Sequence, residues 1–305
     1  MFWQTGTATS SRHEGPSMTA ALPPLPAMRF APVPVGSRHR YTGDRFSYME
    51  AGPARAEPLV LLHGVGANSM HWRFQLAGLS DRYRVIAWNA PGYLLSDNLV
   101  AETPTGRDYA EALADFLQAV GVRQACLLGN SFGSRVAQCF AWFYPERVRR
   151  MVLTGTAIGQ PGLPVEDRAA ALVARQAQVA AGGYGFGERV AALLGTQASP
   201  ETAALVQSVL RATNPAGFLQ AVRFGLGHTY TPAFASRLSM PVLLIQGDED
   251  RITPLARNAA VLREALADVR MVVLEGVGHL PEVEAPETVN RLVGRFLAGV
   301  EIEFP

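Results

Sequence analysis

Short apolar runs alternate with longer amphipathic segments along most of the chain, and this alternation constrains the fold more than any other feature. The apolar runs occupy residues 59–62, 83–88, 124–128, 151–154, 241–245 and 270–274. Such runs are typical of strands buried on both faces, and helices between them connect strands that run parallel. We therefore predict an α/β fold with a mostly parallel, doubly wound sheet and an outer strand at residues 45–50.

One interval breaks this alternation. Between about residues 158 and 239 the patterns are helical only, and a glycine-rich stretch at 182–187 interrupts them. Unstructured connections of this length are rare in compact domains, so we predict a helical cap over 158–239, inserted into a core of residues 41–157 and 240–305. The proline-rich residues 1–40 are expected to form a disordered or draped arm.

A serine between two glycines stands where a predicted strand gives way to a predicted helix. The segment is Gly129-Asn130-Ser131-Phe132-Gly133, and the helical pattern continues from it to residue 144. A serine on so tight a turn is forced outward, and the glycines leave room for close packing of helix against strand. The pattern predicts that the hydroxyl of Ser131 faces solvent or substrate.

A serine hydroxyl needs a base within hydrogen-bond reach, and the base needs an anionic group that orients it. Two later segments supply these groups. Residues 247–254 contain Asp248, Glu249 and Asp250 directly after one predicted strand, and His279 follows the last predicted strand. Because parallel strands end at one edge of a sheet, we expect these groups to converge on Ser131.

These motifs resemble the α/β-hydrolase superfamily, in which nucleophile, acid and histidine follow in this order along the chain. The resemblance covers about residues 45–296. It implies that Ser131 is the nucleophile and His279 the general base, with Asp250 as the acid. Asp248 is the competing acid, and otherwise Asp248 and Glu249 are expected to be solvated loop charges.

The resemblance also implies an oxyanion hole made of two backbone N–H groups, those of Val65 and Phe132. His63 and Gly64 lead into this turn, and a structural hydrogen-bonding role is expected for His63. We expect the side chain of Phe132 to shape the pocket.

One loop departs from the family pattern. Related enzymes often have Asp-x-x-Gly-x-Gly-x-Ser after the strand at 83–88, whereas this chain has Asn89 at the acid position and Leu94 at the second glycine. This departure affects the expected loop geometry and pocket wall, and it leaves the proposed triad unchanged.

The resemblance implies hydrolysis of a small or medium, largely apolar acyl ester through an acyl-enzyme. An alternative is a C–C bond hydrolase of aromatic ring-fission products, because Gly129-Asn130-Ser131 is similar to the elbow of those enzymes, although Leu280 departs from the aromatic residue they often have after the histidine. A non-catalytic small-molecule receptor on the same fold is a further alternative. An inward-facing cap arginine could clamp a substrate carboxylate.

Composition excludes several other classes. The formal net charge is +1 without a basic run, so we expect a small-molecule substrate and neither a nucleic-acid nor a membrane partner. Two cysteines form no disulfide framework, and this favours a cytoplasmic location. No group of residues has the spacing of a metal site, so we expect no metal and no cofactor. The sequence is compatible with a homodimer.

Overall fold

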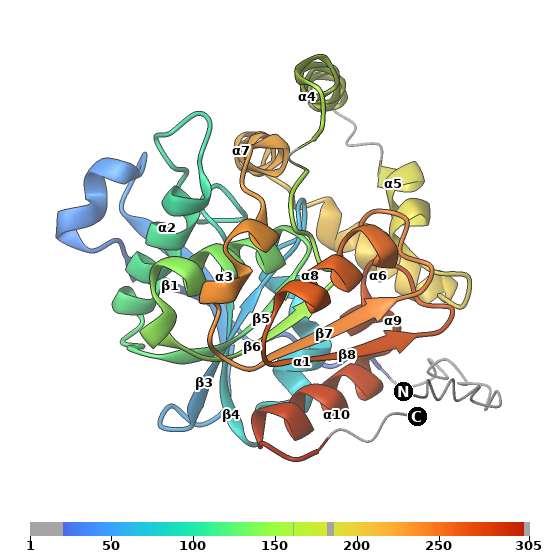
Figure 1. Ribbon diagram of the computed structural model, residues 1–305. Coiled ribbons are helices and arrows are strands. Elements are labelled where there is room, and N and C mark those ends of the chain that lie inside the picture. The colour runs from blue at the N-terminus through green and yellow to red at the C-terminus, as the bar shows by residue number, and fades with distance from the viewer. Residues whose placement is uncertain (1–20, 161, 182–185, 302–305) are drawn as a thin grey trace.

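An eight-stranded sheet forms the centre of the protein (Figure 1). The computed structural model describes residues 21–160, 162–181 and 186–301. The strands are β1 (Met28–Pro32), β2 (Arg45–Ala51), β3 (Glu57–Leu62), β4 (Tyr83–Trp88), β5 (Ala125–Asn130), β6 (Val148–Thr154), β7 (Val242–Gly247) and β8 (Val269–Leu274). Their order is β1-β2-β4-β3-β5-β6-β7-β8, and all pairs from β4 to β8 are parallel. The predicted mostly parallel sheet is therefore confirmed.

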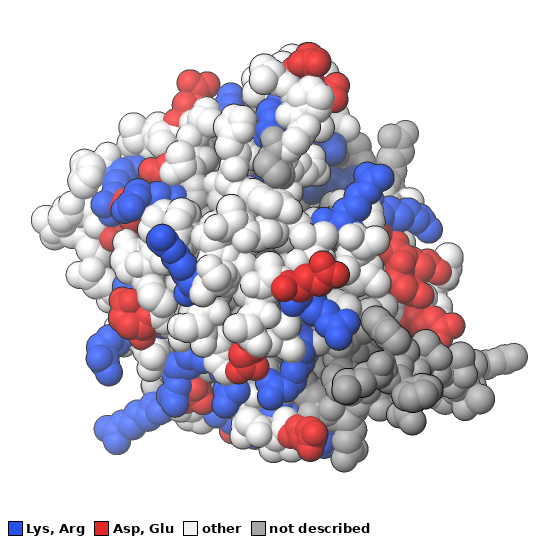
Figure 2. Space-filling view, viewed as in Figure 1, with Lys and Arg blue, Asp and Glu red and all other residues white. Residues whose placement is uncertain are grey.

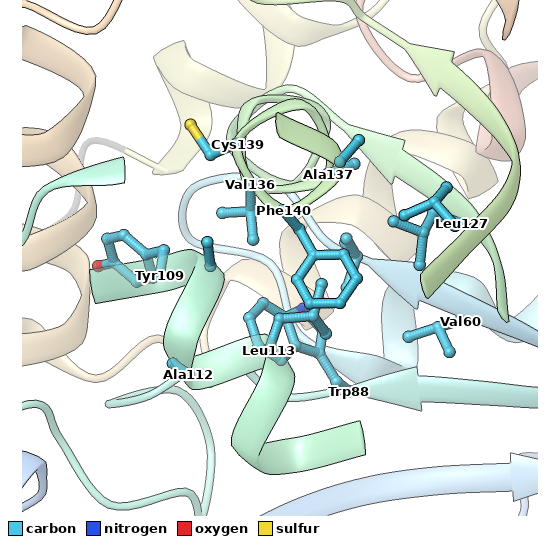
Figure 3. Close-up of a cluster of buried hydrophobic side chains, with 14 of the residues drawn as sticks. Val60, Trp88, Tyr109, Ala112, Leu113, Leu127, Val136, Ala137, Cys139 and Phe140 are labelled. Atoms are coloured by element: carbon cyan, nitrogen blue, oxygen red, sulfur yellow. The ribbon is translucent and has the colours of Figure 1, made fainter. Parts of the chain in front are cut away.

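Helices cover both faces of this sheet. They are α1 (Arg73–Gly78), α2 (Gly106–Ala119), α3 (Phe132–Phe143), α8 (Ala259–Ala265), α9 (Pro281–Glu284) and α10 (Pro286–Leu297). Successive side chains of a strand point to opposite faces. Leu127 of β5 accordingly packs with α2 and α3, while its neighbour Leu128 packs with α1 and α10. Figure 3 shows the first of these layers, in which Phe140 of α3 and Leu113 of α2 meet above the sheet.

The segment before β2 differs from the expected arm. Residues 1–20 lie outside the described part of the chain, but Met28–Pro32 forms β1 and pairs antiparallel with β2. Most of β1 is exposed, which is why it lacks the apolar alternation of a buried strand. The outer strand predicted at 45–50 is β2, and it is covered by β1 at the edge of the sheet.

Between β6 and β7 the chain forms helices and, within its described residues, no strand. The α-helices are α4 (Val165–Ala180), α5 (Phe186–Leu193), α6 (Pro200–Leu210) and α7 (Pro215–Leu226). Most of the glycine-rich stretch at 182–187 lies outside the described residues, and α5 begins at Phe186. In Figure 1, α4, α5 and α7 lie on the opposite side of the sheet from α10.

Short 3-10 helices connect these elements. They are η1 (Val35–Arg40), η2 (Ser69–Trp72), η3 (Pro145–Arg147), η4 (Thr231–Ala233), η5 (Ala235–Arg237) and η6 (Leu255–Arg257). None of the described helices is long and apolar enough to cross a bilayer. Acidic and basic side chains are interspersed over the face seen in Figure 2.

Candidate active site

Ser131 occupies the turn between β5 and α3 in a strained backbone conformation. Its φ is 51° and its ψ is −111°, and its N–H donates to the carbonyl of Thr154 at 3.1 Å. A positive φ is costly for a residue with a Cβ, and such strain is concentrated at functional sites. A Cβ at Gly133 would overlap the carbonyl oxygen of Leu62, so only glycine lets α3 pack this close to β3.

Asp250 and His279 form a buried pair at the carboxyl ends of β7 and β8. Oδ2 of Asp250 lies 2.9 Å from Nδ1 of His279, and the two residues are 5% and 2% exposed. The same carboxylate accepts hydrogen bonds from Gln246 Nε2 at 2.6 Å and from Thr253 Oγ1 at 2.7 Å. The backbone N–H groups of Ile252 and Thr253 donate to Oδ1. These donors fix the position of the carboxylate.

These contacts keep Asp250 ionised. Burial opposes its charge, but the hydrogen bond to His279, the electrostatic interaction with that ring and the hydrogen bonds from Thr253 outweigh burial and lower the pKa of Asp250 to about 2. The backbone of His279 is held as well, because its N–H donates to Leu193 of α5 at 2.7 Å and its carbonyl accepts from Asn130 at 3.0 Å. An ionised carboxylate at Nδ1 can hold an imidazole so that Nε2 is free to accept a proton.

A cavity of about 400 Å³ brings Ser131 and His279 together. It is lined by Gly64, Val65, Ala67, His71, Asn130, Ser131, Arg175, Gln178, Arg189, Ala192, Leu193, Val206, Val209, Leu210, Phe218, Val222, Ile252, His279 and Leu280. About half of these residues come from the helices between β6 and β7, and most of that half are apolar. The cavity can therefore hold an apolar group above the serine.

The two residues predicted to form the oxyanion hole differ in where their side chains lie. Val65 lines the cavity, and neither its N–H nor that of Phe132 has a hydrogen-bond acceptor among the described residues. The expectation that the Phe132 side chain shapes the pocket is wrong. Phe132 is 3% exposed and packs in the core against Tyr93, Tyr109 and Phe224.

His63 has the structural role expected for it. It is fully buried, its Nδ1 lies 2.9 Å from the carbonyl of Gly64, and its Nε2 accepts from the N–H of Ala90. Burial lowers the pKa of His63 to about 3, against a smaller opposing contribution from the Gly64 carbonyl. The ring is therefore neutral at neutral pH, which fits its acceptance of a hydrogen bond at Nε2.

The other acids after β7 fix loops. Asp248 accepts from the N–H of Gly276 at 2.8 Å, and it makes no hydrogen bond or ion pair with His279. Glu249 accepts from both the N–H and the hydroxyl of Thr196 at 2.7 Å. Asp248 is exposed and Glu249 is half-buried, so both are solvent-accessible loop charges as expected, and each also hydrogen-bonds to a neighbouring loop.

The loop that departs from the family pattern keeps a glycine-like backbone at Leu94. Its φ is 49°, the other positive φ of a non-glycine residue in the described chain besides that of Ser131. Asn89 replaces the expected acid and is fully buried, with Oδ1 accepting from the N–H of Ser69 and Nδ2 donating to Ser47. An amide supplies the donor and the acceptor that this buried position requires.

The arginines of the helical segment occupy different environments. Arg175 and Arg189 line the cavity, whereas Arg223 pairs with Glu102 at the surface. Arg189 donates to the carbonyl of Val65 at 2.6 Å and lies 5.3 Å from the ring centre of Phe218. No carboxylate of a described residue forms an ion pair with Arg189. Burial and repulsion from Arg175 lower its pKa to about 10, so it stays charged at neutral pH.

Several site residues had no signal in the sequence. Gln246 and Thr253 contact Asp250, and His71 pairs with Glu282 in the cavity wall at 2.6 Å. Each contact joins residues whose proximity depends on loop geometry. His228 lines a different cavity beside Trp142. Among the residues the structure describes, no cluster of histidine, cysteine and carboxylate could hold a metal ion.

Comparisons with known proteins agree with this architecture. The sequence profile of the alpha/beta hydrolase fold matches residues 57–286. A 2-hydroxy-6-oxononadienedioate/2-hydroxy-6-oxononatrienedioate hydrolase of Burkholderia vietnamiensis is 30% identical over 265 residues, which cover 83% of this chain and 91% of the relative. A poly(3-hydroxyalkanoate) depolymerase of Ectopseudomonas oleovorans is 27% identical over 81% of this chain and 86% of its own length.

Solved structures show the same fold. A thermophilic esterase from Thermogutta terrifontis superposes with a TM-score of 0.77 at 22% identity, over 90% of this chain and all of that one. At this identity the likeness extends to the fold alone. The family match spans most of the sheet and both sides of the helical segment, and on that ground the chain belongs to the α/β hydrolase family.

Proposed function

We propose that the protein is a serine hydrolase that cleaves a small or medium, largely apolar acyl ester. The observation that carries this proposal is the buried Asp250–His279 pair, 2.9 Å apart, with His279 in the same cavity as the strained Ser131. This arrangement supports a nucleophile, a general base and an acid in the order used by hydrolases of this fold.

In the proposed mechanism, Ser131 Oγ attacks the acyl carbonyl and its proton passes to Nε2 of His279. Asp250 holds the imidazole by Nδ1 and stabilises its positive charge. The backbone N–H groups of Val65 and Phe132 would stabilise the oxyanion, with a single such donor contributing about 3 kcal/mol. His279 then protonates the leaving alcohol, and water, deprotonated by the same ring, releases the acid from the acyl-enzyme.

Residues 158–239, which contain the helices α4 to α7, are proposed to form a cap over the cavity. Their side chains form much of the cavity wall, and this wall includes Val206, Leu210 and Phe218. Exclusion of water by such a wall strengthens the electrostatic interactions at the serine and selects for apolar acyl groups.

A second candidate is hydrolysis of a C–C bond in a ring-fission product. Arg189 supports it, because a charged guanidinium without a carboxylate partner in the described cavity wall can bind the carboxylate of a substrate. The name of the Burkholderia vietnamiensis relative describes a dienedioate substrate. A carboxylate-bearing ester would satisfy the same arginine.

A substrate panel distinguishes the two candidates. We expect p-nitrophenyl esters of short and medium chain length to be hydrolysed faster than a ring-fission dienoate, measured as kcat/KM for each. A dienoate with the higher kcat/KM would favour C–C bond hydrolysis. Absence of turnover on every member by folded protein would favour the third alternative, a small-molecule receptor.

The role of Arg189 has its own test. Arg189→Met should reduce kcat/KM for a carboxylate-bearing ester at least about 10-fold more than for its neutral counterpart, because a charge-assisted hydrogen bond is lost. Arg211→Met is the matched control, since Arg211 is an exposed arginine of the same helical segment. An equal loss for both esters would mean that Arg189 only holds the Val65 carbonyl and does not bind the substrate carboxylate.

A cytoplasmic location is also proposed. Cys126 and Cys139 are both buried and free, and this supports a reducing compartment.

A further inference from the structure

A second carboxylate–imidazole pair lies beside the same cavity, and its imidazole, that of His71, is part of the cavity wall. His71 of η2 and Glu282 of α9 approach to 2.6 Å between Nε2 and Oε1, and they are 5% and 0% exposed. The edge of the His71 ring packs at a right angle to Trp72, with ring centres 5.0 Å apart. Gln75 donates to the backbone carbonyl of Glu282 at 3.0 Å. The imidazole is therefore held in one orientation.

Stability alone gives a weak reason for this pair. Removing a carboxylate and an imidazole from water is costly, and apolar residues of similar volume often stabilise a fold as well or better. The neighbouring parts of the wall are apolar, with Val206, Leu210 and Leu280 close by in the same cavity. A buried polar pair at this position therefore indicates that the cavity binds a polar group of its ligand.

Nδ1 of His71 determines which polar group of a ligand can bind. Nε2 of His71 is hydrogen-bonded to Oε1 of Glu282, and Nδ1 makes no hydrogen bond to a described residue. His71 itself lines the cavity that contains Ser131 and His279. Nδ1 accepts a hydrogen bond when the ring is neutral and donates one when the ring is protonated. A hydroxyl group both donates and accepts, so it can bind Nδ1 in either state.

We propose that His71, positioned by Glu282, binds a hydroxyl group of the substrate. The protein would then prefer acyl esters that carry a hydroxyl over their unsubstituted counterparts. This inference rests on the proposed hydrolase function and adds a substrate class to it. Glu282 is the positioning residue, and His71 is the residue that touches the substrate.

The kinetic test compares p-nitrophenyl hexanoate with its 3-hydroxy and 6-hydroxy analogues. The wild type should hydrolyse at least one hydroxy analogue with a kcat/KM about 10-fold or more above that of the hexanoate. In the double variant His71→Leu with Glu282→Leu, which leaves no orphaned charge, this ratio should fall to about 1. Glu282→Gln should retain the preference, because the amide oxygen still accepts from Nε2.

His228→Leu is the matched control, since His228 lies at a different cavity, and its ratio should equal that of the wild type. Circular dichroism and the urea midpoint check the fold of the double variant. Should it not fold, His71→Gln, which keeps a partner for Glu282, takes its place. An unchanged ratio in the double variant, or in His71→Gln where that takes its place, would overturn the inference. A wild type without preference for either hydroxy analogue would overturn it too.

A binding measurement separates this inference from the proposed hydrolysis. Calorimetric titration of full-length Ser131→Ala with hexanoate, 3-hydroxyhexanoate and 6-hydroxyhexanoate requires no turnover. Tighter binding of a hydroxy acid that disappears when His71 and Glu282 are also replaced supports the subsite even if no ester is cleaved. Equal binding of all three acids would refute the subsite while leaving the hydrolase proposal intact.

Discussion

At the scale of single residues, hydrogen bonding distinguishes the two aspartates that follow β7. Asp250 contacts Nδ1 of His279, whereas Asp248 accepts from the backbone of Gly276. The two carboxylates are two positions apart in the chain, and the turn between them directs only Asp250 to the imidazole.

We expect Asp250→Asn to lower kcat about 10³- to 10⁴-fold, because an amide at this position favours the wrong tautomer of His279. Asp248→Asn, the matched control, should keep kcat within about threefold. Steady-state kinetics on one p-nitrophenyl ester would measure both. A larger loss in Asp248→Asn than in Asp250→Asn would reassign the acid.

The lowered pKa of the buried His63 should make the stability of the protein depend on pH. Its pKa in the folded protein is about 3, below the ordinary 6.5, so between these values the unfolded chain binds a proton that the folded chain does not. The free energy of unfolding should therefore fall as pH drops from 7 toward 3, by about 2 kcal/mol between pH 7 and pH 5 from this group.

Urea unfolding at pH 7 and pH 5 measures this change. His63→Gln, which keeps an acceptor for the N–H of Ala90, should show a smaller difference between the two pH values. The same pH dependence in wild type and variant would show that other groups cause it.

At the scale of elements, the contact of α3 with β3 depends on a glycine. Gly133→Ala would drive a methyl group into the backbone of Leu62 and so displace the helix that begins at Phe132. We expect a loss of about 3 kcal/mol or more in the free energy of unfolding.

Gly225→Ala is the opposite case on α7. A Cβ there meets nothing within 4 Å, so the substitution should stabilise the protein by about 0.5–1 kcal/mol through helix propensity. Urea unfolding of both variants checks the pair, and a stable Gly133→Ala would contradict the packing described for the turn.

Arg135 joins α3 to the end of α7. The residue is 4% exposed, and its guanidinium donates to the carbonyls of Phe224, Gly225 and Thr229 at 3.2, 2.9 and 2.8 Å. Arg135→Met would leave these carbonyls without their donor, and hydrogen exchange should accelerate in peptides covering residues 215–230.

The control for this experiment is Arg223→Met, which removes a surface pair with Glu102 and should change exchange little. Equal exchange in wild type and Arg135→Met would mean that the α7 end is held by its packing alone.

At the scale of the whole molecule, the sequence predicted the elements whose pattern is local. The buried parallel strands and the amphipathic helices α2, α3 and α10 lie where apolar periodicity placed them. β1 was missed because it is mostly exposed and ends in a proline, so it lacks a buried strand's pattern. α8 was missed because seven residues are too few to show a helical period.

The site divides in the same way. Ser131, Asp250 and His279 each belong to a local motif, and the shared edge of parallel strands predicted their convergence. Arg189 and His71 belong to no motif, because only the fold of distant segments brings them to one cavity and sets Glu282 behind His71. Phe132 was misplaced because the turn that exposes Ser131 directs the next side chain into the core.

The central claim is that Ser131 is an activated nucleophile, and reaction with a fluorophosphonate probe tests it most directly. Peptide mass spectrometry of the labelled wild type should locate the probe on Ser131. Ser131→Ala should not be labelled, and His279→Gln should be labelled far more slowly because the base is gone. Folded wild-type protein that is not labelled, or is labelled at another serine, would contradict the account.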